Sequence, residues 1–125
     1  MEQVHVGPFI NFQGRAREAM EFYQRALGGE VQLQEDGGRI NFARLELDGA
    51  RIVGSDGHPN YPATVGDNIA VALSGRDRDR LTRAFETLAE GGQVKGRLRP
   101  QAPGAEVGYL LDRFGVNWIV TIQEA

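Results

Sequence analysis

The sequence contains no cysteine and only two histidines among its 125 residues. The absence of cysteine excludes disulfide bonds, thiolate metal ligands and cysteine nucleophiles. Ser55 and Ser74 are the only serines, and neither lies in a Gly-x-Ser-x-Gly sequence, so the nucleophile elbow of a serine hydrolase is missing. A glycine-rich Gly-x-Gly-x-x-Gly loop for nucleotide phosphates is absent too.

Long apolar runs and a surplus of basic residues are also lacking. No stretch approaches the roughly 20 apolar residues that span a bilayer, and the first residues show neither the basic start nor the apolar run of a signal peptide. Fourteen basic and 17 acidic residues give a net charge of −3, which is unlike the basic footprint of a nucleic-acid-binding protein. We therefore expect a cytoplasmic protein that contacts neither membrane nor nucleic acid.

Two amphipathic helices are predicted, at residues 15–27 and 77–90. In both, apolar residues recur at i, i+3, i+4 and i+7, which places them on one helical face. Both segments run into a Gly-Gly pair, Gly28-Gly29 and Gly91-Gly92, which can supply a left-handed helix end.

The two helix endings match at an offset of 63 residues, about half the chain, and indicate an internal duplication. The predicted strands fit it: they fall at residues 4–12, 31–34, 40–47 and 51–55, and again at 68–74, 94–98, 107–111 and 117–122. Each half therefore reads strand, helix and three strands. We expect one domain over residues 1–125, with a first module at about 1–56, a loop at 57–67 and a second module at about 68–125.

The strand at residues 40–47 has two unlike faces. Ala43, Leu45 and Leu47 share one face, which suits packing against a helix. The other face carries Ile40, Phe42, Arg44 and Glu46, and a charged pair among apolar residues is unusual for a core. Two interpretations remain open for that face: it lines a solvated cavity, or it is an exposed sheet surface.

Several segments together resemble the PhnB-like branch of the vicinal oxygen chelate superfamily, which includes glyoxalases and bleomycin-resistance proteins. The similar segments, in chain order, are Phe9-Ile10-Asn11-Phe12, Ala19-Met20-Glu21-Phe22-Tyr23, Leu27-Gly28-Gly29, Asp67 to Leu73, Leu88 to Gly92 and Asp112 to Trp118. The resemblance spans nearly the whole chain. It implies an α+β fold of two βαβββ modules, whose antiparallel-rich curved sheets surround a ligand cavity.

Enzymes of this superfamily hold a divalent metal with four side chains, mostly His and Glu, and use it as a Lewis acid. The corresponding positions here are Gly7 or Pro8, Phe42, Asn68 and Ile119. Glycine, proline, phenylalanine and isoleucine side chains cannot ligate a metal, so we expect no metal and no cofactor. A shifted metal site that uses His5 and Glu46 is the alternative.

The resemblance also places a set of side chains toward the cavity, in phase with the lost metal ligands. The candidate ligand-binding residues are Phe9, Asn11, Phe42, Arg44, Glu46, Asn68, Asn117 and Thr121, with Ala70, Ala72 and Ile119 between them. This mixture of apolar and polar groups is typical of small-molecule sites. Arg44 can pair with an anionic or carbonyl-bearing ligand, or with Glu46.

Two functions are weighed on these grounds. The missing ligands favour a metal-free protein that binds a small molecule, either to sequester it or to carry it. The alternative is a lyase, isomerase or dioxygenase with a shifted or absent metal site. No catalytic residue can be assigned; His58, beside Asp56, has the residue types of a general base but more commonly occurs as a solvated loop residue.

The chain is also predicted to form a homodimer. Two small sheets in so short a chain leave strand edges and sheet faces uncovered, and twofold pairing is the commonest form of homo-oligomer. Similar proteins of this length pair two chains. In such a pair the loop between the modules can bring His58 or Tyr61 over the cavity of the partner.

Overall fold

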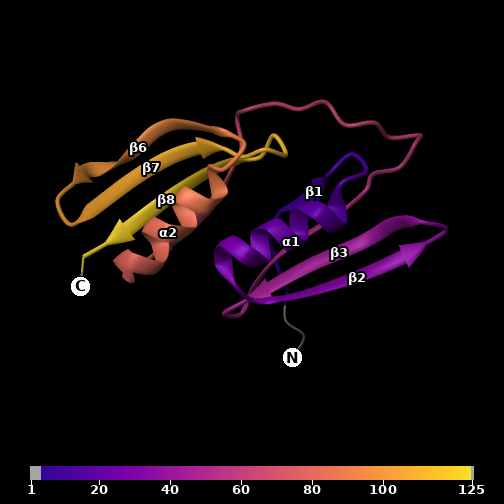
Figure 1. Cartoon of the computed structure of the whole chain (residues 1–125), viewed down its shortest axis with the longest axis horizontal. Coiled ribbons are helices and arrows are strands. Elements are labelled where there is room, and N and C mark those ends of the chain that lie inside the picture. Colours follow the sequence, from indigo (N-terminus) through magenta and orange to yellow (C-terminus); the bar gives the residue numbers. More distant parts are fainter. Residues whose placement is uncertain (1–3, 125) are drawn as a thin grey trace. The chain divides into compact units, whose positions relative to one another are not determined.

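The computed structural model describes residues 4–124, which form two compact units that meet in sequence between Thr64 and Val65 (Figure 1). Within this range the first unit contains one helix and four strands: β1 (Phe9–Asn11), α1 (Ala16–Leu27), β2 (Glu30–Asp36), β3 (Arg39–Leu47) and β4 (Ala50–Ser55). The second repeats the order: β5 (Ala70–Gly75), α2 (Arg78–Leu88), β6 (Gln93–Ala102), β7 (Ala105–Leu111) and β8 (Asn117–Gln123). The predicted βαβββ repeat is confirmed.

The two sheets have the same topology. Their strand orders are β1-β4-β3-β2 and β5-β8-β7-β6. In each unit the first strand pairs in parallel with the last, and the other pairs are antiparallel. The helix provides the crossover that a parallel pair requires. The α+β fold expected from the sequence is therefore present in both halves.

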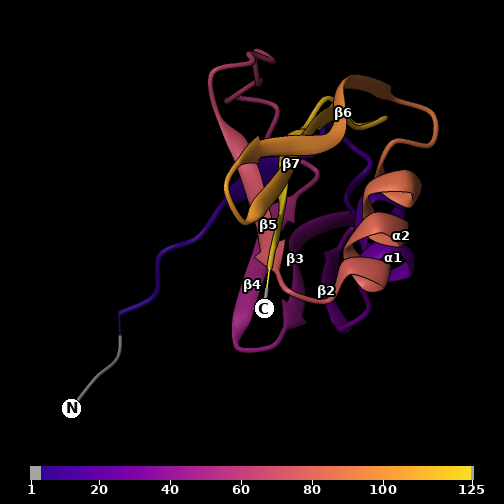
Figure 2. The same ribbon diagram turned by 90° about the vertical axis from the view of Figure 1, so that its left-hand side faces the viewer.

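Each helix covers one face of its own sheet (Figure 2). In the first unit, Met20 and Tyr23 of α1 are fully buried, as are Ala43 and Leu45 of β3. The second unit has an equivalent core, formed by Leu81, Ala84, Phe85 and Leu88 of α2 with Leu110, Trp118, Val120 and Ile122. Because only one face of each sheet packs on a helix, the other face is left open within its unit. Neither helix is long and apolar enough to cross a membrane, for the residues that the structure describes.

Gly29 directly precedes β2 and lies against β3, and Gly92 directly precedes β6 and lies against β7. A Cβ atom on Gly29 would lie 2.5 Å from the Glu46 carbonyl oxygen, and one on Gly92 would lie 2.1 Å from that of Leu111. Real Cβ atoms do not approach a backbone oxygen so closely, so the turn after each helix requires glycine for space. The duplicated Gly-Gly signal in the sequence thus marks the same packing contact twice.

Two first strands begin later than predicted. β1 starts at Phe9 rather than at residue 4, and β5 starts at Ala70 rather than at residue 68. Val4 and Val6 have the alternation of a strand but are almost fully exposed. Among the described residues, the pairing of β1 with β4 begins at Phe9, and before it Pro8 O accepts a 3.2 Å hydrogen bond from Val53 N of β4. The strand-like pattern of the sequence alone therefore predicts both strands to be longer than they are.

A β-bulge in β3 places Ile40 on the opposite face of the sheet from the one predicted. Gln34 pairs with Phe42 whereas its neighbour Glu35 pairs with Ile40, which leaves Asn41 as an extra residue. An extra residue reverses the alternation of side chains beyond it. Ile40 consequently joins the core, with an exposed fraction of 4%, and does not share the open face with Phe42, as expected from the sequence.

Candidate functional site

A row of four paired residues crosses the open face of the first sheet. Phe9 pairs with Val53, Val53 with Arg44, and Arg44 with Gln32, so the row runs through all four strands. Directly paired residues point to the same side of a sheet. Two residues of the row, Phe9 and Arg44, were predicted from the sequence. Phe9 is 60% exposed, which is unusual for so large an apolar side chain.

Arg44 is the half-buried charge of this row. Its Nη2 group donates a hydrogen bond to the Gln32 side-chain oxygen Oε1. Its Nε atom is fully buried and has no hydrogen-bond partner among residues 4–124. Buried donors are nearly always satisfied in folded proteins, so an acceptor is missing at this position. The ion pair between Arg44 and Glu46, which was the alternative expected from the sequence, does not form.

The other candidates of the first unit flank this row. Glu46 lies two residues beyond Arg44 on the same face, and its carboxylate is 3.8 Å from the Arg51 guanidinium. Phe42 lies two residues before Arg44 and is half-buried. Asn11, at the end of β1, accepts a 2.8 Å hydrogen bond from Gln13 N. The first sheet therefore collects five of the eight predicted site residues.

The open face of the second sheet carries Asn117 and Thr121 on β8. Asn117 is only 8% exposed, and its Oδ1 atom accepts a 3.1 Å hydrogen bond from Lys95 Nζ. Its Nδ2 atom donates to the Ile69 carbonyl oxygen at 3.5 Å. Asn68 lies outside β5 and is exposed, so it does not belong to the strand row in which it was expected.

Four residues of the open faces were not predicted: Gln32 and Val53 in the first unit, and Lys95 and Tyr109 in the second. Tyr109 pairs with Ile119 and shares its face, and more than a third of its surface is exposed. In β7 the residues on either side of Tyr109, Gly108 and Leu110, are buried, so alternation along the strand predicts that Tyr109 lies on the open face. Lys95 could not be found in this way, because bulges on both sides of Gly96 disturb the alternation of β6.

The side chains at the superfamily's metal-ligand positions do not fit a metal. Among residues 4–124, no cluster of three or more histidine, cysteine, aspartate or glutamate side chains could hold an ion. His5 is exposed and precedes β1, and Glu46 is paired with Arg51. The donor set of a vicinal oxygen chelate enzyme is therefore not assembled in the part of the chain that is described.

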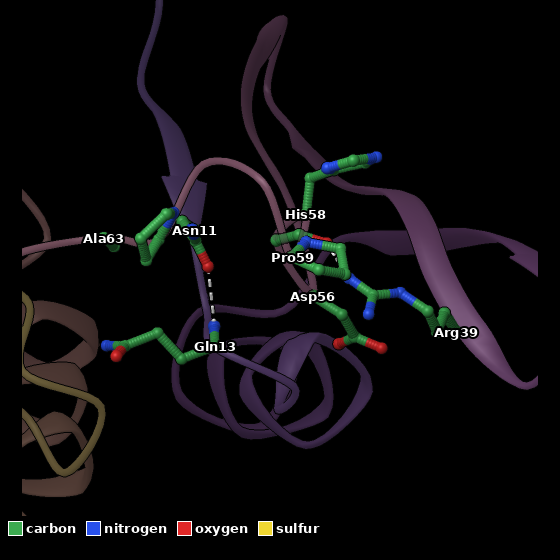
Figure 3. Close-up of a pocket in the computed structure, with 9 residues that line it drawn as sticks. Asn11, Gln13, Arg39, Asp56, His58, Pro59 and Ala63 are labelled. Atoms are coloured by element: carbon green, nitrogen blue, oxygen red, sulfur yellow. Dashed lines mark hydrogen bonds between the residues drawn. The ribbon is translucent and has the colours of Figure 1, made fainter.

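The Asp56 carboxylate has a structural task. Its two oxygens accept 2.8 Å hydrogen bonds from Ala16 N, at the start of α1, and from Ile40 N, in β3. The His58 ring points away from it (Figure 3) and accepts a 3.1 Å hydrogen bond from Asn60 N through Nδ1. A general-base pair of His58 and Asp56, considered from the sequence, is therefore not formed.

A separate cavity of about 260 Å³ opens beside the loop that follows β4 (Figure 3). It lies within the first unit and is lined by Asn11, Gln13, Arg39, Asp56, Gly57, His58, Pro59, Pro62 and Ala63. Arg39 Nη2 donates a hydrogen bond to the Gly57 carbonyl oxygen and so ties the loop to β3. Of the predicted site residues, only Asn11 lines this cavity.

Comparison with known proteins identifies relatives over nearly the whole chain. The model of a family described as 3-demethylubiquinone-9 3-methyltransferase matches residues 4–121. The crystal structure of protein PA1353 from Pseudomonas aeruginosa is 30% identical, covers 98% of this chain and 100% of its own, and superposes with a TM-score of 0.88.

Two further solved structures are similar at lower identity. A putative 3-demethylubiquinone-9 3-methyltransferase, PhnB protein, from Bacillus cereus is 22% identical with a TM-score of 0.77, over 94% of this chain and 98% of its own. A glyoxalase-related enzyme from Fulvimarina pelagi is 18% identical with a TM-score of 0.69, over 98% and 89% of the two chains. At these identities the likeness shows the fold.

Proposed function

This chain belongs to the family described as 3-demethylubiquinone-9 3-methyltransferase, in the PhnB-like branch of the vicinal oxygen chelate superfamily, and from that premise we propose that it binds a small molecule without a metal. The ligand lies on the open face of the first sheet and contacts Phe9, Phe42 and Arg44. The protein sequesters or carries this ligand. Asn117 and Thr121 offer polar contacts on the second sheet.

The buried, unpartnered Nε–H of Arg44 carries this proposal. Leaving a buried hydrogen-bond donor unsatisfied costs on the order of 1–3 kcal/mol, and more for a charged group. Because Nε is covered by its neighbours, a ligand oxygen recovers this loss once the Arg44 side chain turns to expose the group. Arginine presents its donors in a planar fork that suits carboxylate and carbonyl oxygens. The ligand therefore carries an anionic or carbonyl oxygen.

The neighbouring aromatic side chains suggest the rest of the ligand. Phe9 and Val53 lie in the same row as Arg44, and Phe42 lies beside it on β3. Flat apolar walls with one oriented polar group are typical of sites for small aromatic molecules. The family's description names a demethylated quinone as its substrate. A hydroxylated benzoquinone, which combines a flat ring with carbonyl oxygens, is therefore a suitable first probe.

Calorimetric titration with such a quinone and with benzoate tests the site. Arg44→Gln removes the charged donor, and we expect it to weaken binding at least tenfold, which is about 1.4 kcal/mol. Arg97→Gln is the matched control, since Arg97 lies exposed on β6 and makes no ion pair within the described residues. Equal affinity of wild type and Arg44→Gln for every probe bound would exclude Arg44 as the ligand contact.

The second candidate is a lyase, isomerase or dioxygenase with a shifted metal site. It is favoured by one observation, the presence of the Glu46 carboxylate on the same face as Arg44. Against it, Glu46 already pairs with Arg51, and His5 is exposed outside the sheet. About one divalent ion per chain, lost together with activity on chelation, would favour the enzyme with a shifted site. An enzyme with no metal, the other form of this alternative, would be recognised by turnover of a substrate.

We also propose that the chain acts as a homodimer in the cytoplasm. Val4, Val6 and Phe9 are large apolar residues that the first unit leaves exposed along one segment. Strands β2 and β6 are sheet edges with unpaired backbone groups on their outer side. A second copy of the chain would cover such surfaces from water.

A further inference from the structure

Several of the side-chain acceptor atoms that line the cavity beside the loop after β4 already accept hydrogen bonds from backbone N–H groups. Both oxygens of Asp56 accept backbone N–H groups, as described above. Asn11 Oδ1 accepts from Gln13 N at 2.8 Å, and His58 Nδ1 accepts from Asn60 N at 3.1 Å. A ligand that enters this cavity therefore meets few free acceptors.

The free hydrogen-bonding atoms of the lining are mainly donors. Because His58 Nδ1 accepts a hydrogen bond, the proton of the neutral ring lies on Nε2, which can donate. Asn11 Nδ2 makes no hydrogen bond, and Arg39 uses only its Nη2 group, toward the Gly57 carbonyl oxygen. The Gln13 side-chain amide is free to donate as well. Donors from β1, β3 and two loops thus line one cavity, in which Arg39 and Asp56 have opposite charges.

The backbone of this cavity is held in place. Gly57 has a φ of +87°, and a Cβ atom there would lie 2.5 Å from Asn11 Oδ1, so the loop packs directly on β1. Gln13 has a φ of +53°, which is uncommon for a residue other than glycine. Non-glycine residues in this region often occur at binding sites, where the surroundings hold them.

We propose that this cavity binds the carboxylate group of a small organic acid. The donors of Arg39, His58 and Asn11 recognise the two carboxylate oxygens. Arg39 supplies the positive charge that attracts the carboxylate, and Asp56, whose two oxygens already accept backbone N–H groups, disfavours a second negative charge on the ligand. Pro59, Pro62 and Ala63 form the apolar side of the cavity and accommodate a short hydrocarbon chain. Arg44 does not line this cavity, which shares only Asn11 with the candidate residues of the first sheet.

Amide NMR spectra of the full-length protein test the proposal, with sodium acetate and sodium isobutyrate as probes. Ionic strength is kept constant with sodium chloride. We expect saturable shifts of the Gln13, Gly57 and His58 amides, and tighter binding of isobutyrate because of the apolar side. Arg39→Gln should raise the Kd at least fivefold. Arg83→Gln, an equal charge change at an exposed position of α2, should leave the Kd unchanged.

Other results would overturn the proposal. One is shifts that grow linearly with acetate without saturating; another is an equal Kd for wild type and Arg39→Gln. His58→Phe gives a second reading that does not alter the contact of Arg39 with Gly57, and it too should weaken binding. Sulfate, which carries two charges, should bind more weakly than acetate. Tighter binding of sulfate would contradict the assignment to carboxylates.

Discussion

The indole Nε1 group of Trp118 donates a 2.9 Å hydrogen bond to the carboxylate of Asp112. Asp112 is 2% exposed, and its other oxygen accepts from the backbone amides of Phe114 and Val116 at 2.8 and 3.0 Å. One carboxylate thus ties the turn between β7 and β8 to the largest core side chain. Within the Asp112 to Trp118 segment, these contacts give Asp112 and Trp118 a structural role in building the turn.

Asp112→Ala should destabilise the protein by about 3 kcal/mol, because it leaves one indole and two backbone donors without their acceptor. The free energy of unfolding in urea measures the effect. Asp67→Ala, in an exposed part of the loop between the units, is the control and should change stability by less than about 0.5 kcal/mol. A loss below about 1 kcal/mol for Asp112→Ala would mean that water replaces the carboxylate.

Gly92→Ala should destabilise the protein by about 2 kcal/mol or more, through the contact of the new methyl group with the Leu111 carbonyl oxygen. Gly66→Ala is a matched control. Neither glycine has a positive φ, and the only atom near a Cβ on Gly66 is Asn68 Oδ1, at 3.8 Å. Thermal unfolding of the two variants therefore isolates the steric contact. Similar melting temperatures would show that the turn before β6 moves to make room.

Purified protein should contain far less than one equivalent of zinc, nickel, iron or manganese, and a chelator should leave its melting temperature unchanged. The reason is the side chains at the four ligand positions: three of them, Phe42 and Ile119 among these, have no donor atom, and the amide of Asn68 alone is a poor ligand. Elemental analysis and a thermal shift with and without chelator check this. One ion per chain, lost in a variant such as Glu46→Gln, would instead support the enzyme alternative.

Light scattering at micromolar concentration should give a mass near twice 13.7 kDa, as a homodimer requires. The exposed Val4, Val6 and Phe9 provide apolar surface for such a contact. Val6→Asp should shift the equilibrium toward the monomer, because it places a charge in this apolar segment. A mass of 13.7 kDa that does not change on concentrating would exclude the dimer.

The sequence predicts the helices and the order of the strands because those signals are local. The periodic stripes of α1 and α2 and the Gly-Gly pairs after them lie within a few residues of each other, and the structure has both helices within three residues of the predicted ends. The open face of the first sheet follows from simple alternation in the regular part of β3, which is why Arg44 was identified, whereas Asn117 was placed by the resemblance to the family.

What the sequence does not predict depends on contacts between distant residues. The bulge at Asn41 arises from pairing with β2 and reverses the face of Ile40. Asp56 accepts a hydrogen bond at the start of α1, 40 residues away in the sequence. In the sequence Asp56 stands beside His58 and suggests a catalytic pair, whereas in the structure its carboxylate has a structural role. The buried Arg44 Nε has no sequence signal, because its burial results from four strands packing side by side.

The pairing of first with last strand in each sheet determines how the chain can be divided. β1 pairs with β4 and β5 with β8, so every strand of one sheet comes from residues before Thr64 and every strand of the other from residues after Val65. A single cut between these two residues separates no pair of hydrogen-bonded strands. The molecule is therefore suited to expression as two fragments, each with a complete strand ladder, so that the folding of each half can be measured by itself.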